Sequence, residues 1–425
     1  MSHIAPIWAN LGRMPNAFGA APQSSEFLSL SLRLRLYSLP WLFLAIAYWS
    51  TGNGVLDFRK VVVGWDFADF WTAGVFLTQH RLSSIFDISA FDGFQRALWG
   101  SNMPFHLWSY PPTALFIMAP LGILPYIAAY IIWLLITGGI CLWGASRLGL
   151  RGWQLALLAI SPAMMINAIA GQTGALAAGL LLGGVGLMSR RPIIAGILFG
   201  LLTIKPQLGL LVPIALIAAR NWRCFGAAAL TAVTLVVASI LAFGLESWVS
   251  YFTVSGPLTA SIIANEQGMF VRLMPTWFMA ARLVGLPLSV GLGAQLISLV
   301  ASAILIYWSY RSSTPVRPGC ANKLLLIGSL LATPYTHSYD MIGVAAALLL
   351  GLVERPAAFK EGWRYYLLTQ CWILPWSIMV WNGIHFPLGP VMLWLLMIDF
   401  YRSVTRSCGT DSPLPTGHAD TEQCT

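Results

Sequence analysis

Charged side chains are scarce in this chain. Of its 425 residues, 9% are lysine, arginine, aspartate or glutamate, whereas 57% are hydrophobic, and the mean hydropathy is +0.73. A soluble domain carries about a quarter charged residues, so these charges are too few to cover a soluble surface. The composition excludes a soluble enzyme and a disordered chain, and it predicts an all-α polytopic membrane protein.

Cysteine is scarce as well, with 6 residues in the whole chain. Cys141 and Cys371 fall in predicted membrane spans, and we place the other four on the cytoplasmic side: Cys224, Cys320, Cys408 and Cys424. This distribution excludes a disulfide scaffold. No cysteine or histidine spacing is typical of a metal site, and we expect neither a metal nor another cofactor.

The apolar segments predict about twelve transmembrane helices, because a helix of roughly 17–25 apolar residues can cross a bilayer. Several of the segments are short, so their boundaries are loose by several residues. The predicted spans are 35–51, 126–146, 153–168, 172–188, 192–204, 207–219, 224–244, 289–309, 321–334, 339–353, 365–382 and 386–402. No internal repeat is visible, which argues against an inverted-repeat transporter.

One further apolar segment, Leu107–Leu124, is interrupted by Pro111, Pro112 and Pro120. If this segment does not cross the membrane, most of the 24 basic residues face the cytoplasm, and if it crosses, few of them do. The positive-inside rule favours the first arrangement. We therefore predict a proline-broken segment at the outer interface or dipping into it, with a kinked spanning helix as the alternative.

This topology predicts a single transmembrane domain, 35–402, between a cytoplasmic N-terminal segment, 1–34, and a cytoplasmic tail, 403–425. Its large external segments are 51–125, with interfacial helices, and 245–288. No secretory signal peptide is evident in residues 1–30. We attribute the net charge of +9 to cytoplasmic arginines beside anionic lipids, not to nucleic-acid binding.

Two external carboxylates, Asp66 and Asp69, are three residues apart and share one face if their segment is helical. Held at a membrane surface, such a pair can provide a general base with a raised pKa. The alternative is that Asp66 caps the N-terminus of a helix and the surrounding aromatic residues anchor the interface.

Two polar motifs in the first half of the chain contain candidate ligand-binding residues. Tyr110 precedes Pro111 and Pro112, and its hydroxyl can bind a ligand or belong to an interfacial aromatic belt. Gln172 lies between Gly171 and Gly174 at the outer end of two spans, where it can orient a polar ligand or form part of a tight turn.

Two later motifs place charged or polar residues between apolar segments. Lys205 is costly there unless it is paired or functional, and its ammonium suits a phosphate; the alternative is snorkelling to the interface. Gln207 follows two residues later. His337 has Asp340 three residues on, which can set the tautomer of the imidazole, although a polar turn gives the same pattern.

Taken in order, these motifs resemble glycosyltransferase family 87, over roughly residues 60–350. The resemblance is carried by Asp66-Phe67-(two residues)-Phe70-Trp71, Phe86-Asp87, Tyr110-Pro111-Pro112, Gly171-Gln172, Lys205-Pro206-Gln207 and Tyr335-Thr336-His337-(two residues)-Asp340. Family members are integral-membrane enzymes of the GT-C superfamily. The resemblance implies a GT-C-like bundle in the cytoplasmic membrane with its active site on the external face.

The resemblance also implies an activity: transfer of a hexose, typically mannose, from a polyprenyl-phosphate donor to a hydroxyl of a glycolipid or glycan acceptor, with inversion. Asp66 matches the position of the general base, and Asp69 stands where relatives often have an aliphatic residue. The resemblance therefore leaves three alternatives for the base: Asp66, Asp69, or the two carboxylates sharing one proton.

We expect Lys205 and His337 to bind the donor phosphate as cations, Tyr110, Gln172 and Gln207 to position substrate, and Asp340 to orient His337. A transporter or flippase for a lipid-linked sugar is the main alternative function, and a non-catalytic membrane scaffold is the third.

Overall fold

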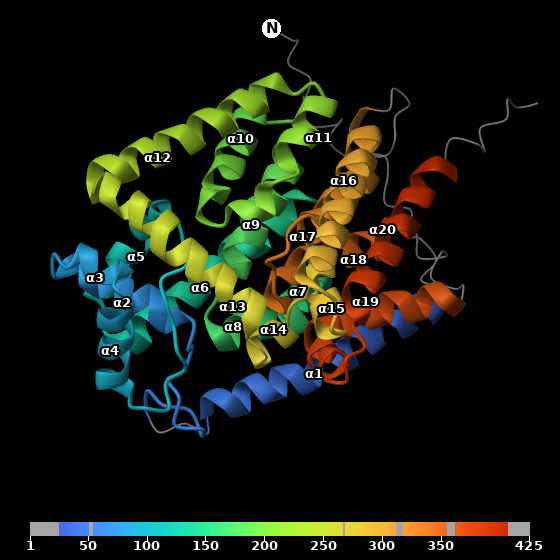
Figure 1. Cartoon of the computed structure of the whole chain (residues 1–425). Coiled ribbons are helices and arrows are strands. Elements are labelled where there is room, and N and C mark those ends of the chain that lie inside the picture. The colour runs from blue at the N-terminus through green and yellow to red at the C-terminus, as the bar shows by residue number, and fades with distance from the viewer. Residues whose placement is uncertain (1–24, 51–53, 267, 312–317, 355–361, 407–425) are drawn as a thin grey trace, which may run out of the picture.

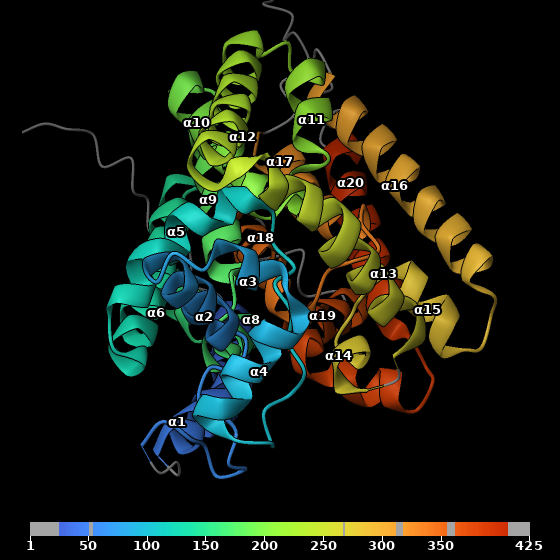
Figure 2. The same cartoon turned by 60° about the vertical axis from the view of Figure 1, so that its left-hand side comes forward.

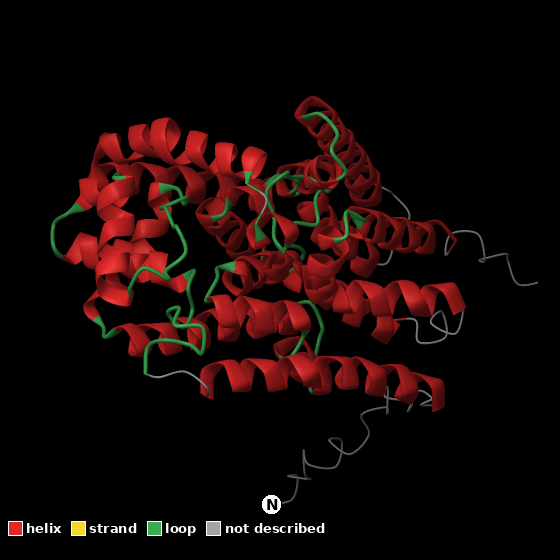
Figure 3. Ribbon diagram, turned by 60° about the horizontal axis from the view of Figure 1, so that its bottom comes forward, coloured by secondary structure: helices red, strands yellow, loops and turns green. Residues whose placement is uncertain are grey.

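The structure, a computed structural model, describes residues 25–50, 54–266, 268–311, 318–354 and 362–406 (Figure 1). Within these ranges the chain forms helices joined by turns and loops, and its β-type pairing is one isolated bridge between Leu56 and Val62 (Figure 3). The predicted all-α class is therefore confirmed for the described residues. Of the predicted cytoplasmic segments, 1–24 and 407–425 lie outside them, as do Cys408 and Cys424.

The predicted external segment 51–125 contains several helices. The chain leaves α1 (Ser25–Ser50) and forms α2 (Phe67–Thr78), α3 (Leu82–Phe86) and α4 (Ile88–Trp99). Helix α4 begins after Asp87, whose side chain accepts a hydrogen bond from the backbone N–H of Ala90 and so satisfies one free donor of the helix start. Helix α2 is buried along most of its length, which fixes the residues at its N-terminus.

The proline-rich segment forms one short helical run of three contiguous pieces, η2 (Pro112–Ala114), α5 (Leu115–Met118) and η3 (Ala119–Ile123), and its place at the outer interface stays a prediction. Proline lacks a backbone N–H and restricts the residue before it, so no long helix forms here. The segment packs closely against α2, since a Cβ added to Gly122 would lie 2.1 Å from the carbonyl carbon of Gly74.

The remaining helices form the main bundle. They are α6 (Tyr126–Arg147), α7 (Trp153–Ala159), α8 (Pro162–Ala170), α9 (Gly174–Leu187), α10 (Pro192–Leu201), η4 (Leu202–Ile204), η5 (Pro206–Gly209), α11 (Val212–Ala218), α12 (Trp222–Ser250), η6 (Tyr251–Ser255), α13 (Gly256–Asn265), α14 (Met269–Arg272), α15 (Trp277–Leu283), α16 (Leu288–Arg311), α17 (Pro318–Leu331), η7 (Ser338–Met341), α18 (Ile342–Glu354), α19 (Gly362–Gly383) and α20 (Leu388–Arg406).

Three of the described helices are long and apolar enough to cross a membrane: α6, the run Trp222–Asn265 and α16. The pair α7 and α8, bent by 45°, would add a fourth. Most other predicted spans also coincide with apolar helices, but α9, α10, α11 and α17 are shorter than the roughly 20 residues that a crossing requires. The membrane-helix class is supported, whereas the number of about twelve spans stays a prediction.

The predicted external segment 245–288 is largely helical. Helix α12 passes through a kink at Gly244 (φ 73°, ψ 155°), a conformation that only glycine adopts without strain, and continues through η6 into α13. Figure 2 shows this run leading from one end of the bundle towards α14 and α15. The kink carries the second half of the run over the site described below.

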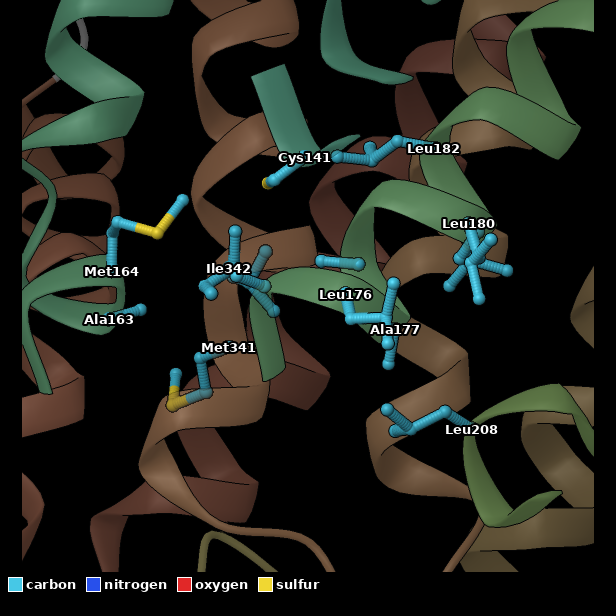
Figure 4. Packing of buried hydrophobic residues seen from close by; sticks show 14 of the residues in the cluster. Cys141, Ala163, Met164, Leu176, Ala177, Leu180, Leu182, Leu208, Met341 and Ile342 are labelled. Carbon is cyan, nitrogen blue, oxygen red and sulfur yellow. The ribbon is translucent and has the colours of Figure 1, made fainter. Parts of the chain in front are cut away.

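The core is centred on α9, which is buried along nearly its whole length. Side chains of α9 such as Leu176 and Ala177 pack with Ile342 of α18 and with Cys141 of α6 (Figure 4). Helices α6 and α9 approach closely, because a Cβ on Gly144 would lie 2.3 Å from the carbonyl oxygen of Gly179. This rigid centre supports the turn before α9 and the turn before η7, both of which contribute to the site.

Candidate functional site

A cavity of about 740 Å³ lies between the first external segment and the α13–α14 region. One wall comes from residues 59–69 and 104–110, and Ile166, Ala170 and Gln172 extend it. The opposite wall comes from residues 259–273, and the turn before η7 closes the cavity with Tyr335, His337 and Tyr339. Of the predicted site residues, the cavity lining includes Asp66, Asp69, Tyr110, Gln172 and His337.

Asp66 stands immediately before α2, and its side chain makes no capping hydrogen bond. Its backbone N–H donates to the carbonyl of Ala170 (3.0 Å), and its Oδ2 accepts a hydrogen bond from Nε2 of Gln172 (3.0 Å). The side chain is 20% exposed and faces the cavity. The helix-cap alternative is therefore not the role of this carboxylate.

His106 lies between the two carboxylates and was not singled out by the sequence. Its Nδ1 is 3.3 Å from Oδ1 of Asp69, and its Nε2 is 3.8 Å from Oδ1 of Asp66. Asp69 Oδ1 also accepts a hydrogen bond from Nε2 of the buried Gln95 (2.8 Å). No local pattern marks His106 or Gln95, because their partners are distant in the chain: Gln95 reaches Asp69 from α4, and His106 reaches both carboxylates from the loop after α4.

Burial and charge set the protonation of this group. Burial raises the pKa of Asp66 to about 6, although the charge of His106 and the hydrogen bond from Gln172 act in the opposite direction. Burial lowers the pKa of His106, but Asp69 and Asp66 outweigh it and raise that pKa to about 9. At neutral pH, His106 is a cation, and Asp66 is mostly ionised and able to accept a proton.

Tyr110 and Gln172 extend the hydrogen-bonded chain that begins at Asp66. The hydroxyl of Tyr110 donates to Oε1 of Gln172 (2.8 Å) and lies 3.2 Å from Oγ1 of Thr173. The same Oε1 accepts from the backbone N–H of Thr173 (3.1 Å). These contacts orient the Gln172 amide so that its NH₂ group points at Asp66.

Lys205 is buried and does not line the cavity. Its Nζ is 2.5 Å from Oδ1 of Asp340 and 4.8 Å from the ring centroid of Tyr339. The other oxygen of Asp340 accepts a hydrogen bond from the backbone N–H of His337 (3.1 Å). This carboxylate therefore holds the main chain of the turn and does not orient the imidazole. Lys205 thus does not snorkel to a surface, and Gln207, in η5, does not line the cavity either.

His337 lines the cavity and has a ring nitrogen without a partner among the described residues. Its ring stacks on Tyr339 (centroids 5.0 Å apart) and contacts Phe270, and its buried Nε2 has no hydrogen-bond partner among the described residues. Burial and the charge of Lys205 lower the pKa of His337 to about 3. The imidazole is therefore neutral at neutral pH, which corrects the expectation of a cation, and it can contribute a hydrogen bond but no charge.

Comparison with known proteins gives one match. The model of glycosyltransferase family 87 matches residues 108–334, which include Tyr110, Gln172, Lys205 and Gln207. Asp66, Asp69, His106 and His337 lie outside the matched range but line the same cavity, and Asp340, also outside that range, holds the turn of His337. No curated protein and no solved structure matches the chain. Among the described residues, no three His, Cys, Asp or Glu side chains are arranged to hold a metal ion.

Proposed function

The chain belongs to glycosyltransferase family 87, and from that premise we propose that it transfers a hexose, mannose in the first instance, from a polyprenyl-phosphate donor to a hydroxyl of a glycolipid or glycan acceptor. The observation that carries this proposal is Asp66. A largely buried carboxylate with a raised pKa faces a cavity large enough for a sugar and its phosphate. The family does not favour the transporter alternative.

Asp66 is the general base of this scheme. It accepts the proton of the acceptor hydroxyl while that oxygen attacks the anomeric carbon. The bond from that carbon to the phosphate oxygen breaks at the same time, and its electron pair leaves with the lipid phosphate, which gives inversion. Asp69 is the weaker candidate for the base, because its Oδ1 is already contacted by the amide of Gln95 and by Nδ1 of His106. The contact from His106 to Asp66 is longer, at 3.8 Å.

The departing phosphate is stabilised in part by His337, a residue of the cavity lining whose buried Nε2 has no hydrogen-bond partner among the described residues. Lys205 reaches a phosphate only by leaving Asp340, so we assign the pair to holding the turn that presents His337. Tyr110 acts on the substrate through Gln172. Gln207 retains a substrate-positioning role only if the substrate extends beyond the cavity lining.

The membrane setting completes the proposal. Phe105 and Met269 are exposed apolar residues of the cavity lining, 47% and 58% exposed, and they offer contacts to an isoprenoid chain. We place the protein in the cytoplasmic membrane with the cavity on the external face and both termini in the cytoplasm, in accord with the positive-inside rule. The scheme requires no metal or other cofactor.

The test is transfer of radiolabelled mannose from a polyprenyl-phosphate donor by the purified protein in lipid nanodiscs, with extracted membrane glycolipids as acceptors. Asp66→Asn should lower turnover by roughly 10²–10⁴-fold, because a general base contributes about that factor. Donor binding should stay near the wild-type value.

The matched control is Asp87→Asn, since Asp87 caps α4 outside the cavity and asparagine caps a helix equally well. Turnover of the Asp87 variant should be unchanged. Near-normal turnover of the Asp66 variant would show that the base is assigned wrongly. A wild-type protein that transfers no sugar from any polyprenyl-phosphate donor would remove the proposed reaction.

A further inference from the structure

The cavity contains more negative than positive charge. Among its lining residues, Asp66, Asp69 and Glu266 are carboxylates, and only Arg59 and His106 carry positive charge at neutral pH. A phosphodiester donor adds a negative charge, and its departure as a phosphomonoester adds another. A charge of this kind needs a cation close by in a site that is shielded from water.

We propose that Arg59 forms an anion subsite of this cavity and binds the phosphate of the lipid-linked donor. The inference rests on the proposed function, since it names the residue that would recognise the charged part of that donor.

Three other cations near the cavity are already engaged. Lys205 is paired with Asp340 and does not line the cavity, and His106 is held between Asp66 and Asp69. Arg282 donates to the carbonyl of Glu266 and does not line the cavity either. Among the described residues that line it, Arg59 is the cation without contact to the catalytic carboxylates.

Arg59 is held in a defined place. Its Nε and Nη2 both contact Oδ2 of Asp57 (2.9 and 2.8 Å), whose side chain is fully buried. The other oxygen of Asp57 accepts the backbone N–H groups of Arg59 (2.8 Å) and Val61 (3.0 Å), and the bridge between Leu56 and Val62 closes the turn. A buried carboxylate thus fixes both the turn and its guanidinium.

The free part of the guanidinium suits a phosphate. The Arg59 side chain is 42% exposed, and its Cζ lies 5.1 Å from the ring centroid of Trp65, the residue before Asp66. A guanidinium has five N–H donors, and the contacts to Asp57 use two of them, so donors remain for phosphate oxygens. Arginine binds phosphate through paired hydrogen bonds, whereas a lysine at this place would provide only a point charge.

The experiment measures the binding of farnesyl phosphate and of farnesol to the full-length protein in detergent, by calorimetry. The two probes share the isoprenoid chain and differ in the phosphate. The wild-type protein should bind farnesyl phosphate more tightly than farnesol. Arg59→Gln should weaken farnesyl phosphate binding by roughly ten- to a hundredfold, because it removes a charged hydrogen-bond donor, and should leave farnesol binding within about twofold.

The matched control is Arg96→Gln. Arg96 belongs to the same external segment and is paired with Asp92, but it does not line the cavity, and its side chain is 36% exposed. Its variant should keep the preference for farnesyl phosphate.

A double variant, Asp57→Asn/Arg59→Gln, is measured as well, because Arg59→Gln alone leaves the buried Asp57 unpaired. Asparagine at position 57 retains the turn, and the preference for farnesyl phosphate should again be lost.

The outcomes separate the two proposals. If the wild-type protein binds farnesyl phosphate no more tightly than farnesol, the lipid-phosphate donor class is wrong. If the wild-type protein shows the preference and the double variant retains it, the Arg59 subsite is wrong while the proposed function stands. Loss of the preference in both Arg59 variants, with the Arg96 variant unaffected, supports the subsite.

Discussion

At the scale of single residues, the protonation of Asp66 depends on two opposing effects. Burial raises its pKa to about 6, and the imidazolium of His106 limits that rise. A base with a pKa near the working pH combines a large ionised fraction with a strong tendency to accept a proton. His106 is thus a positioning residue in our scheme, because it acts through the carboxylate of Asp66.

This arrangement predicts a pH dependence. Asp66 must be ionised to act, so transfer should be present above pH 6 and should be lost as the pH falls through about 6, where the carboxylate takes up a proton. His106→Gln removes the cation that lowers the pKa of Asp66. The acid limb of kcat/KM should then move to higher pH, by about one unit for a charge at this distance.

His80→Gln serves as the control for this pH profile. His80 is an exposed histidine of the same external segment and does not line the cavity, so its variant should keep the wild-type profile. An acid limb that stays in place in the His106 variant would show that the imidazole does not act on the base.

The sequence pointed to Asp66, Tyr110, Gln172 and His337, because each stands in a short polar motif inside an apolar chain, and the fold brings them to one cavity. It could not show that Lys205 and Asp340 form an ion pair, because 135 residues separate them. His106 lies in no motif, and its role follows only from the distances to Asp66 and Asp69.

At the scale of elements, the turn between α17 and η7 depends on a buried ion pair. Lys205, 3% exposed, holds Asp340, 4% exposed, and Asp340 holds the backbone of His337. Lys205→Met leaves a buried carboxylate without its partner, which typically costs about 3–5 kcal/mol. We therefore expect a clearly lower thermal midpoint, measured by tryptophan fluorescence of the purified protein in detergent.

A second variant tests the cause of that loss. Lys205→Met/Asp340→Asn removes both charges and keeps an oxygen that accepts the His337 N–H, so its midpoint should lie above that of the single variant. Lys60→Met, at an exposed lysine, should change nothing. A Lys205 variant as stable as the wild type would show that the turn does not depend on this ion pair.

Helix boundaries were predictable where sequence signals coincide. Helix α6 starts after Pro125 and ends at Arg147, within one residue of the predicted span. Helix α12 continues beyond the predicted end at residue 244, because Gly244 bends the helix without ending it and Glu246 remains exposed on the following turns. A charge marks the limit of an apolar span, but it does not end a helix.

At the scale of the whole molecule, hydropathy predicted the class more securely than the number of spans. An apolar segment can be apolar because lipid surrounds it or because protein does. Helix α9 is buried along nearly its whole length by other helices, and its 14 residues are too few to cross a bilayer alone. Composition cannot distinguish burial by lipid from burial by protein, whereas the packing of the described helices can.

The orientation of the molecule predicts which surfaces an external reagent reaches. Ser261 lines the cavity from α13, and Ser189 is exposed after α9, where the positive-inside rule places the cytoplasmic face beside Arg190 and Arg191. With Cys408 and Cys424 replaced by serine, Ser261→Cys should react with a membrane-impermeant maleimide in intact cells. Ser189→Cys should react only after the membrane is permeabilised.

The native background of this experiment is low, because Cys141, Cys224, Cys320 and Cys371 are all buried. Labelling of Ser189→Cys in intact cells, with none of Ser261→Cys, would invert the topology and place the cavity in the cytoplasm. The donor would then have to be presented from the inner leaflet. Labelling at Ser261 alone places the base, the cavity and the proposed phosphate subsite on the external side, where an acceptor glycan is exposed.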